Sequence, residues 1–344
     1  MNISRTRRPA ALRRLALAAM LLCPHAPAAV ADPAPEGLGD GTSFLPAVTH
    51  KNLTLIPLVT SDPLDPAGEE VATLDEGMRS KKVKIAEVDQ SGSVGTLRIE
   101  NKTGKPLFLM AGEVVLGGKQ DRIVGKNTLI PKGANQNIPV FCVEHGRWNG
   151  RKVEFESAGV LAHKKLRTKA SFKDQGEVWK EVGEKNTKRG TANETDTYRQ
   201  VAQQQAGGTL ASWEKAIGAS LAALPAAQRQ RMVGVAVAVN GEVVAVDVFG
   251  TPALYAKLEQ KLLRSYITEA IDEPIAKNLK TPAAADVRVF LAKAKAEPEP
   301  ETRAYESDDS ETLEKAGKGA GSTKVIRKGG GKAKPVYESI QKME

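Results

Sequence analysis

The chain has 344 residues, 41% of them hydrophobic, which is enough apolar material for one large globular domain or two small ones. Its formal charge of +9 suggests a nucleic-acid partner, but five of the positive charges are arginines between residues 5 and 14. Without them the charge is +4, so the composition gives no support to a nucleic-acid-binding protein.

Residues 1–31 have the three parts of a secretory signal. A basic start is followed by an apolar run over residues 15–23 and by Ala29-Val30-Ala31, a small-residue cleavage site. The apolar run is shorter than the roughly 20 residues that span a bilayer. We therefore expect a signal peptide at 1–31, export from a bacterial cytoplasm to the periplasm or beyond, and no transmembrane span after cleavage.

Residues 32–49 are rich in proline, glycine and alanine, and we interpret them as a linker. Short alternating runs then predict strands, and Pro57 favours an edge or a strand end for the first of them. The runs are 52–58, 83–88, 96–101, 106–110, 113–116, 127–131 and 138–144. No helix-length segment separates them, which favours an antiparallel arrangement.

The second half of the chain changes to helical periodicity. The patterns predict helices over 176–186, 194–205, 209–224 and 283–296, and another that starts after Thr251-Pro252. Asn240-Gly241 between two β-branched runs predicts a hairpin over 233–249. The expected fold class is α+β: an antiparallel β-rich N-terminal half packed with helices and completed by a C-terminal β-hairpin and helix, in a single globular domain over 50–296.

The last segment, 297–344, has an acidic block followed by a basic, glycine-rich block. Such composition rarely buries enough apolar surface to offset the entropy of ordering. We expect a disordered charged tail that is solvated, pairs its two blocks with each other, or contacts a partner in the cell envelope.

Polar residues gather in the stretch Phe141–Trp148, at the end of a predicted strand. Strand alternation places Cys142 and Glu144 on one face. Cys142 is a candidate catalytic thiol, although the nearby carboxylate raises a thiol pKa and free cysteines are usually buried and structural. Glu113 could face Glu144 across the sheet, and two such carboxylates can cleave a glycosidic bond.

The same stretch offers groups for binding a ligand. Arg147 beside Trp148 suits a small ligand that carries an anionic group or a flat ring, and Lys119 and Arg122 would add positive potential. The alternative is that Arg147 forms a structural bridge to Glu144. The histidines and Cys142 lack zinc-type spacing, so we expect no metal site, and no motif requires a cofactor.

Several blocks of this sequence together resemble a bacterial family, the ADP-ribosylglycohydrolase and rhodanese-phosphatase-superfamily associated protein domain. The blocks are 53–57, 112–122, 127–128, 138–148 and 239–266, and they add Gln120 and Asn127 to the candidate ligand-binding residues. The resemblance implies a link to ADP-ribose or NAD-derived metabolism but no established activity. Two hypotheses remain: a noncatalytic ligand-binding or interaction domain of the envelope, and a hydrolase of an ADP-ribosyl, nucleotide or glycosyl bond.

Overall fold

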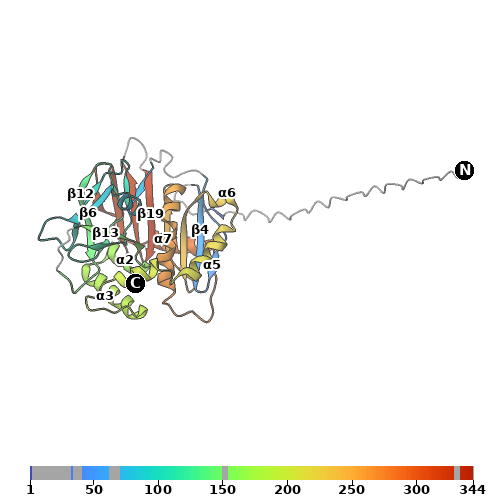
Figure 1. Ribbon diagram of the computed structural model, residues 1–344. Helices are drawn as coiled ribbons and strands as arrows, with labels where there is room; N and C mark the ends of the chain where they lie inside the picture. Colours follow the sequence, from blue (N-terminus) through green and yellow to red (C-terminus); the bar gives the residue numbers. More distant parts are fainter. Residues whose placement is uncertain (2–31, 34–40, 62–69, 149–153, 329–333, 344) are drawn as a thin grey trace.

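The computed structural model describes residues 1, 32–33, 41–61, 70–148, 154–328 and 334–343. The predicted signal peptide lies outside the described residues, apart from Met1. Figure 1 shows strands and helices packed into one body. At one end lie β12 (Asn135–Cys142), β6 (Val83–Glu87) and β13 (Phe155–Leu161), and at the other lie β4 (Leu53–Thr60), α5 (Ala211–Ala222) and α6 (Ala226–Arg229). No helix in the described part of the chain is both long and apolar enough to span a membrane.

A ten-stranded sheet, here called the large sheet, contains strands from both the N-terminal and the C-terminal parts of the described chain. Its order is β1-β2-β4-β14-β15-β19-β18-β17-β16, with β3 also on β4, and all its neighbours are antiparallel. The strands are β1 (Asp32–Pro33), β2 (Thr42–Phe44), β3 (Val48–His50), β4 (Leu53–Thr60), β14 (Met232–Val239), β15 (Glu242–Phe249), β16 (Thr302–Glu306), β17 (Ser310–Ala316), β18 (Ala320–Arg327) and β19 (Lys334–Lys342).

A six-stranded antiparallel sheet in the order β13-β9-β10-β12-β7-β6 forms a barrel-like second half, and a smaller sheet, β11-β8-β5, lies beside it. A single bridge between Ala86 and Glu154 brings the edge strands β6 and β13 together. The strands are β5 (Ala72–Thr73), β6 (Val83–Glu87), β7 (Thr96–Asn101), β8 (Leu107–Leu109), β9 (Glu113–Gly117), β10 (Arg122–Val124), β11 (Thr128–Ile130), β12 (Asn135–Cys142) and β13 (Phe155–Leu161).

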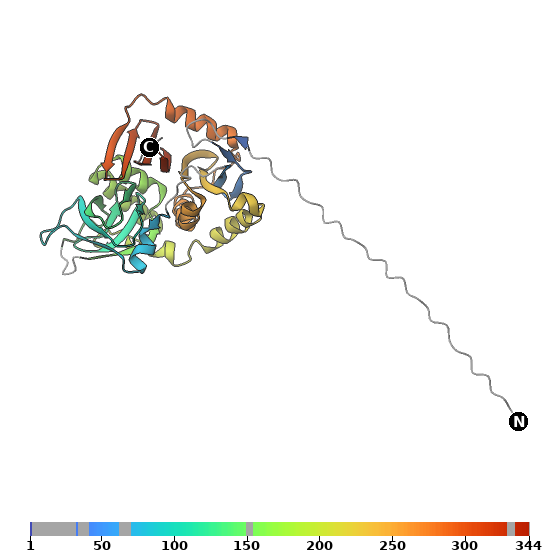
Figure 2. The same cartoon turned by 90° about the horizontal axis from the view of Figure 1, so that it is seen from above.

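Helices cover both faces of the large sheet (Figure 2). Val235 and Val237 of β14 face a core that includes residues of α5 and α7, whereas Ala236 and Ala238 face a core that includes α8, as strand alternation requires. The helices are α1 (Leu74–Arg79), α2 (Lys164–Phe172), α3 (Gln175–Arg189), α4 (Arg199–Ala206), α5 (Ala211–Ala222), α6 (Ala226–Arg229), α7 (Pro252–Ala270) and α8 (Ala284–Lys295).

The predicted α+β fold class is confirmed, and so are several of its local features. Asn240 and Gly241 both have positive φ in a two-residue turn between β14 and β15, as the hairpin turn demands. Thr251 caps α7, because its hydroxyl accepts from the Leu254 amide at 3.1 Å. Pro57 lies inside the large sheet rather than at its edge, in the gap between the partners β2 and β3, where no donor is needed.

The predictions of a linker over 32–49 and a disordered tail over 297–344 are wrong where these residues are described. Residues 42–50 contribute β2 and β3, with Phe44 buried, and the last segment contributes β16 to β19. In β17 and β18, more exposed charged residues such as Lys315 and Lys324 alternate with buried ones such as Thr312 and Val325. The residue composition of a segment does not record this two-residue period. An amphipathic strand can therefore have the same composition as a solvated tail.

Candidate functional site

The carboxylate of Glu144 and the guanidinium of Arg147 form a bidentate salt bridge. Arg147 Nε and Nη2 donate to the two Glu144 oxygens at 2.9 and 2.7 Å, and Nη1 donates to the Gly118 carbonyl at 3.1 Å. The Asp121 amide also donates to Glu144, at 3.1 Å. The geometry therefore matches the alternative in which Arg147 holds the turn between β9 and β10 and leaves little of its guanidinium for a ligand.

Cys142 is enclosed and poorly suited to nucleophilic chemistry. Its thiol lies 3.7 Å from the Val94 carbonyl, and the side chain is fully buried. Burial raises the pKa of the Cys142 thiol to about 11, with Glu87 and Glu144 adding to the effect and Arg122 opposing it. At neutral pH the group is a protonated thiol, which is the form that does not attack electrophiles.

The native protein is therefore expected to leave Cys142 unmodified by Ellman's reagent at pH 7.5, and to release one equivalent of thionitrobenzoate only after unfolding in guanidinium chloride. A chain that starts at Asp32 is the right sample, because residues 1–31 contain the other cysteine, Cys23. Rapid modification of the folded chain would show that the thiol is open and ionised, contrary to this account.

The other predicted ligand-binding residues near this turn lie around the partly exposed indole ring of Trp148. Trp148 is 45% exposed, and Lys119 Nζ and the Arg122 guanidinium carbon lie 5.5 and 5.7 Å from its ring centroid. Arg122 itself is fully buried beside Glu87, and Gln120 contacts the His145 carbonyl at 3.4 Å. The structure thus gathers these residues, but as an internally paired cluster around one indole.

Glu113 and Asn127 lie away from that cluster. Asn127 accepts from the Ala111 amide at 2.8 Å and reaches Thr323 of β18, so it links the two halves of the fold. Glu113 is the first residue of β9, whereas the Glu144–Arg147 bridge contacts Gly117, the last residue of that strand. At the usual strand rise, the two ends of β9 are about 13 Å apart. The geometry gives no glycosidase-type pair of carboxylates from Glu113 and Glu144, because such pairs are separated by roughly 5–9.5 Å.

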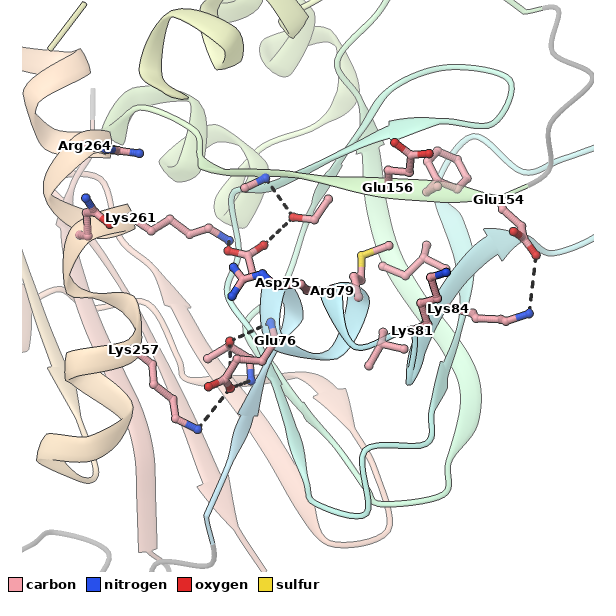
Figure 3. Close-up of a pocket in the computed structure, with 18 residues that line it drawn as sticks. Asp75, Glu76, Arg79, Lys81, Lys84, Glu154, Glu156, Lys257, Lys261 and Arg264 are labelled. Atoms are coloured by element: carbon pink, nitrogen blue, oxygen red, sulfur yellow. Dashed lines mark hydrogen bonds and ion pairs between the residues drawn. The ribbon is translucent and has the colours of Figure 1, made fainter. Parts of the chain in front are cut away.

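A cleft of about 940 Å³ lies elsewhere, between α1, β6, β13 and α7 (Figure 3). The sequence reasoning missed it, although two signals were present. Thr73 and Glu76 form a capping box that starts α1. On α7, Lys257, Lys261 and Arg264 recur at helical spacing and line one wall of the cleft.

Two carboxyl groups and one ammonium group meet at the base of the cleft. Lys261 Nζ lies 2.7 Å from Asp75 Oδ2 and 2.7 Å from Glu113 Oε1, and Ser157 donates to Asp75 at 2.6 Å. Burial opposes charge on Lys261, but Glu113 and Asp75 outweigh it and raise the pKa of the ammonium. Burial likewise opposes charge on Asp75, yet Lys261 and Ser157 lower the pKa of that carboxyl. Lys261 is therefore a fixed cation and a poor nucleophile.

Burial raises the pKa of Glu113 above its usual 4.5, even though Lys261 pulls it down. The folded state therefore binds this proton more tightly than the unfolded state, so the contribution of Glu113 to stability is fully present below about pH 4.5 and declines as pH rises through the folded pKa. Comparison with Glu113→Gln by urea unfolding at pH 4 and pH 7 should show the free energy of unfolding of the wild type falling relative to the variant. A free energy of unfolding of the wild type that instead rises relative to that of Glu113→Gln between pH 4 and pH 7 would contradict the assigned sign.

Two cations of the cleft form no ion pair among the residues that the structure describes, although the charge of Arg79 helps to lower the pKa of the Asp75 carboxyl. Lys84, Lys257 and Arg264 pair with Glu154, Glu76 and Glu214, respectively. Arg79 at the end of α1 and Lys81 just after it are exposed, line the cleft and form no ion pair within the described ranges. These two side chains are therefore available to an anionic ligand.

The fold and the cleft together define an α+β domain with a strand-lined, charged cleft. The family model described as the ARG and Rhodanese-Phosphatase-superfamily-associated Protein domain matches residues 41–333, and the chain belongs to this family. No curated protein and no solved structure gives a significant match. In the part of the chain that the structure describes, no group of three or more His, Cys, Asp or Glu side chains could hold a metal ion.

Proposed function

We propose that this protein is a noncatalytic ligand-binding domain of the cell envelope and that its ligand carries anionic groups that bind in the α1–α7 cleft. The observation that carries the proposal is a pair of exposed cations, Arg79 and Lys81, that form no ion pair within the described residues and line a cleft large enough for a small molecule or a short chain segment. A guanidinium beside an ammonium favours phosphate or carboxylate groups. Export of the chain is part of the proposal and rests on the sequence of residues 1–31.

Binding rather than catalysis is favoured by the state of the reactive groups. Cys142 is a buried, protonated thiol, and Lys261 is held charged between two carboxylates. Asp75 is engaged by both Lys261 and Ser157, so it is not an unpaired base. Fixed charges of this kind orient a bound ligand, whereas general acid–base chemistry requires a group that can exchange a proton near neutral pH.

Thermal unfolding of the mature chain against anions tests the proposal. The panel holds phosphate, citrate, ADP-ribose, nucleotides and neutral sugars, with ADP-ribose included because of the family's name. An anion at 100 times its dissociation constant should stabilise the fold by about 2.7 kcal/mol, or very roughly 5–10 °C. The double variant Arg79→Ala/Lys81→Ala should lose that shift while keeping its own unfolding temperature within a few degrees, because exposed unpaired cations contribute little to stability.

The matched control is Arg98→Ala/Lys180→Ala, which removes the same charge from exposed positions outside the cleft. It should retain the anion response. Equal loss of the response in both double variants would show a net-charge effect rather than a site. Absence of any shift with all of the anions would count against the proposed function itself.

A further inference from the structure

The cleft follows a gap in the six-stranded sheet. β6 and β13 pair antiparallel only at Ala86 and Glu154. Continuing that register would place Val83 opposite Ser157, but among the described residues these strands form no further pair. The strands diverge instead, and both Val83 and Ser157 line the cleft that opens between them.

Backbone groups on both sides of the gap point into it. The Lys102 amide donates to the Lys82 carbonyl at 2.7 Å, and antiparallel bonds to one neighbour recur at every second residue. Val83 therefore directs its amide and carbonyl away from β7, toward the gap. On β13, the Glu154 carbonyl accepts a bond from the end of β9 at 3.4 Å, so Ser157, three residues on, directs its backbone groups away from β9.

The gap is closed on its inner side and open on its outer side. Gly77 of α1 packs so tightly on Val83 that a Cβ there would lie 2.3 Å from a valine methyl, and Asp75 of α1 holds the Ser157 hydroxyl. Arg79 and Lys81 lie beside the opening as exposed cations that form no ion pair within the described residues. The result is a slot with two strand edges and a floor formed by α1, with Arg79 and Lys81 on the α1 side and Glu154 and Glu156 beside the β13 edge.

We propose that the cleft binds an extended acidic peptide segment, which adds as a strand between β6 and β13 and pairs its carboxylates with Arg79 and Lys81. Strand addition uses main-chain hydrogen bonds for affinity and side-chain contacts for specificity. Because β6 and β13 are antiparallel at their bridge, the added strand is parallel to one and antiparallel to the other. This inference rests on the proposed function and narrows its ligand from anions in general to one class.

The test is fluorescence polarisation with the full mature chain and a labelled, end-blocked nonapeptide in which glutamate alternates with threonine and valine. A second peptide of the same sequence carries N-methyl groups on alternate backbone amides, which remove strand hydrogen bonds without changing charge. We expect the N-methylated peptide to bind about tenfold more weakly or worse. The variant Arg79→Ala/Lys81→Ala should weaken the unmodified peptide by a similar factor, and Arg98→Ala/Lys180→Ala should not.

The other outcomes show whether strand addition alone or the proposed function as a whole is wrong. Equal binding of both peptides would overturn strand addition while leaving an anion-binding cleft. Thermal stabilisation by citrate or phosphate without peptide binding would overturn the peptide class but leave the proposed function. If neither the peptide nor any small anion binds, both proposals fail together.

Discussion

A chain that ends at Ala296 is expected not to fold. The deleted segment contains β19, which lies between β15 and β18 inside the large sheet, so its loss exposes β15 along its length. It also removes Tyr337, Val336 and Val325 from the main hydrophobic core. Each buried side chain of this size is worth about 2–5 kcal/mol, and a whole domain is stable by only about 5–15 kcal/mol.

Circular dichroism and thermal unfolding of chains 32–344 and 32–296 measure this effect. The longer chain should unfold cooperatively, whereas the shorter one should show no cooperative transition and should bind hydrophobic dyes. A control that lacks only 343–344 removes the end of the chain and keeps β19. Cooperative unfolding of chain 32–296 at the temperature of the full chain would contradict the ordered C-terminal strands.

Substitution of Asp247 by alanine is expected to cost about 3–5 kcal/mol, because it leaves a buried guanidinium without its counter-charge. Asp247 is fully buried on β15 and accepts hydrogen bonds from the hydroxyls of Tyr266 and Tyr337. Its Oδ1 lies 3.4 Å from Arg167 Nη2, and Arg167 is itself almost fully buried on α2. The cluster joins α2 and α7 to the neighbouring strands β15 and β19 of the large sheet.

Urea unfolding of Asp247→Ala beside Asp308→Ala checks this prediction. Asp308 is exposed, and its substitution should change the free energy of unfolding by less than about 0.5 kcal/mol. The double variant Asp247→Ala/Arg167→Met should recover part of the loss, since removing both charges also removes the unpaired one. A cost below about 1 kcal/mol for Asp247→Ala would show that the guanidinium finds another partner or water.

The sequence predicted the elements whose signals are local. The Asn240-Gly241 turn and the Thr251 cap each depend on a few neighbouring residues, and both are present. The place of the tail could not be predicted in the same way, because β19 pairs with residues about 90 positions earlier. Only tertiary pairing distinguishes such a strand from a charged tail.

The candidate site shows the same limit. The sequence of residues 141–148 predicts a gathering of polar groups but not the partners that those groups find. The Glu144–Arg147 bridge engages most of the Arg147 guanidinium. The cleft, by contrast, takes Asp75 from α1, Ser157 from β13 and Lys261 from α7. These residues are far apart in the sequence, and no motif links them.

The most direct test of the central claim is to map a bound anion on the chain 32–344 by backbone amide chemical shifts. During a citrate titration, the account predicts that the largest shifts fall at 79–85 and 155–159 and vanish in Arg79→Ala/Lys81→Ala. Shifts that instead centre on 117–122 and 142–148, around Trp148, would contradict it and place the ligand at the other end of β9.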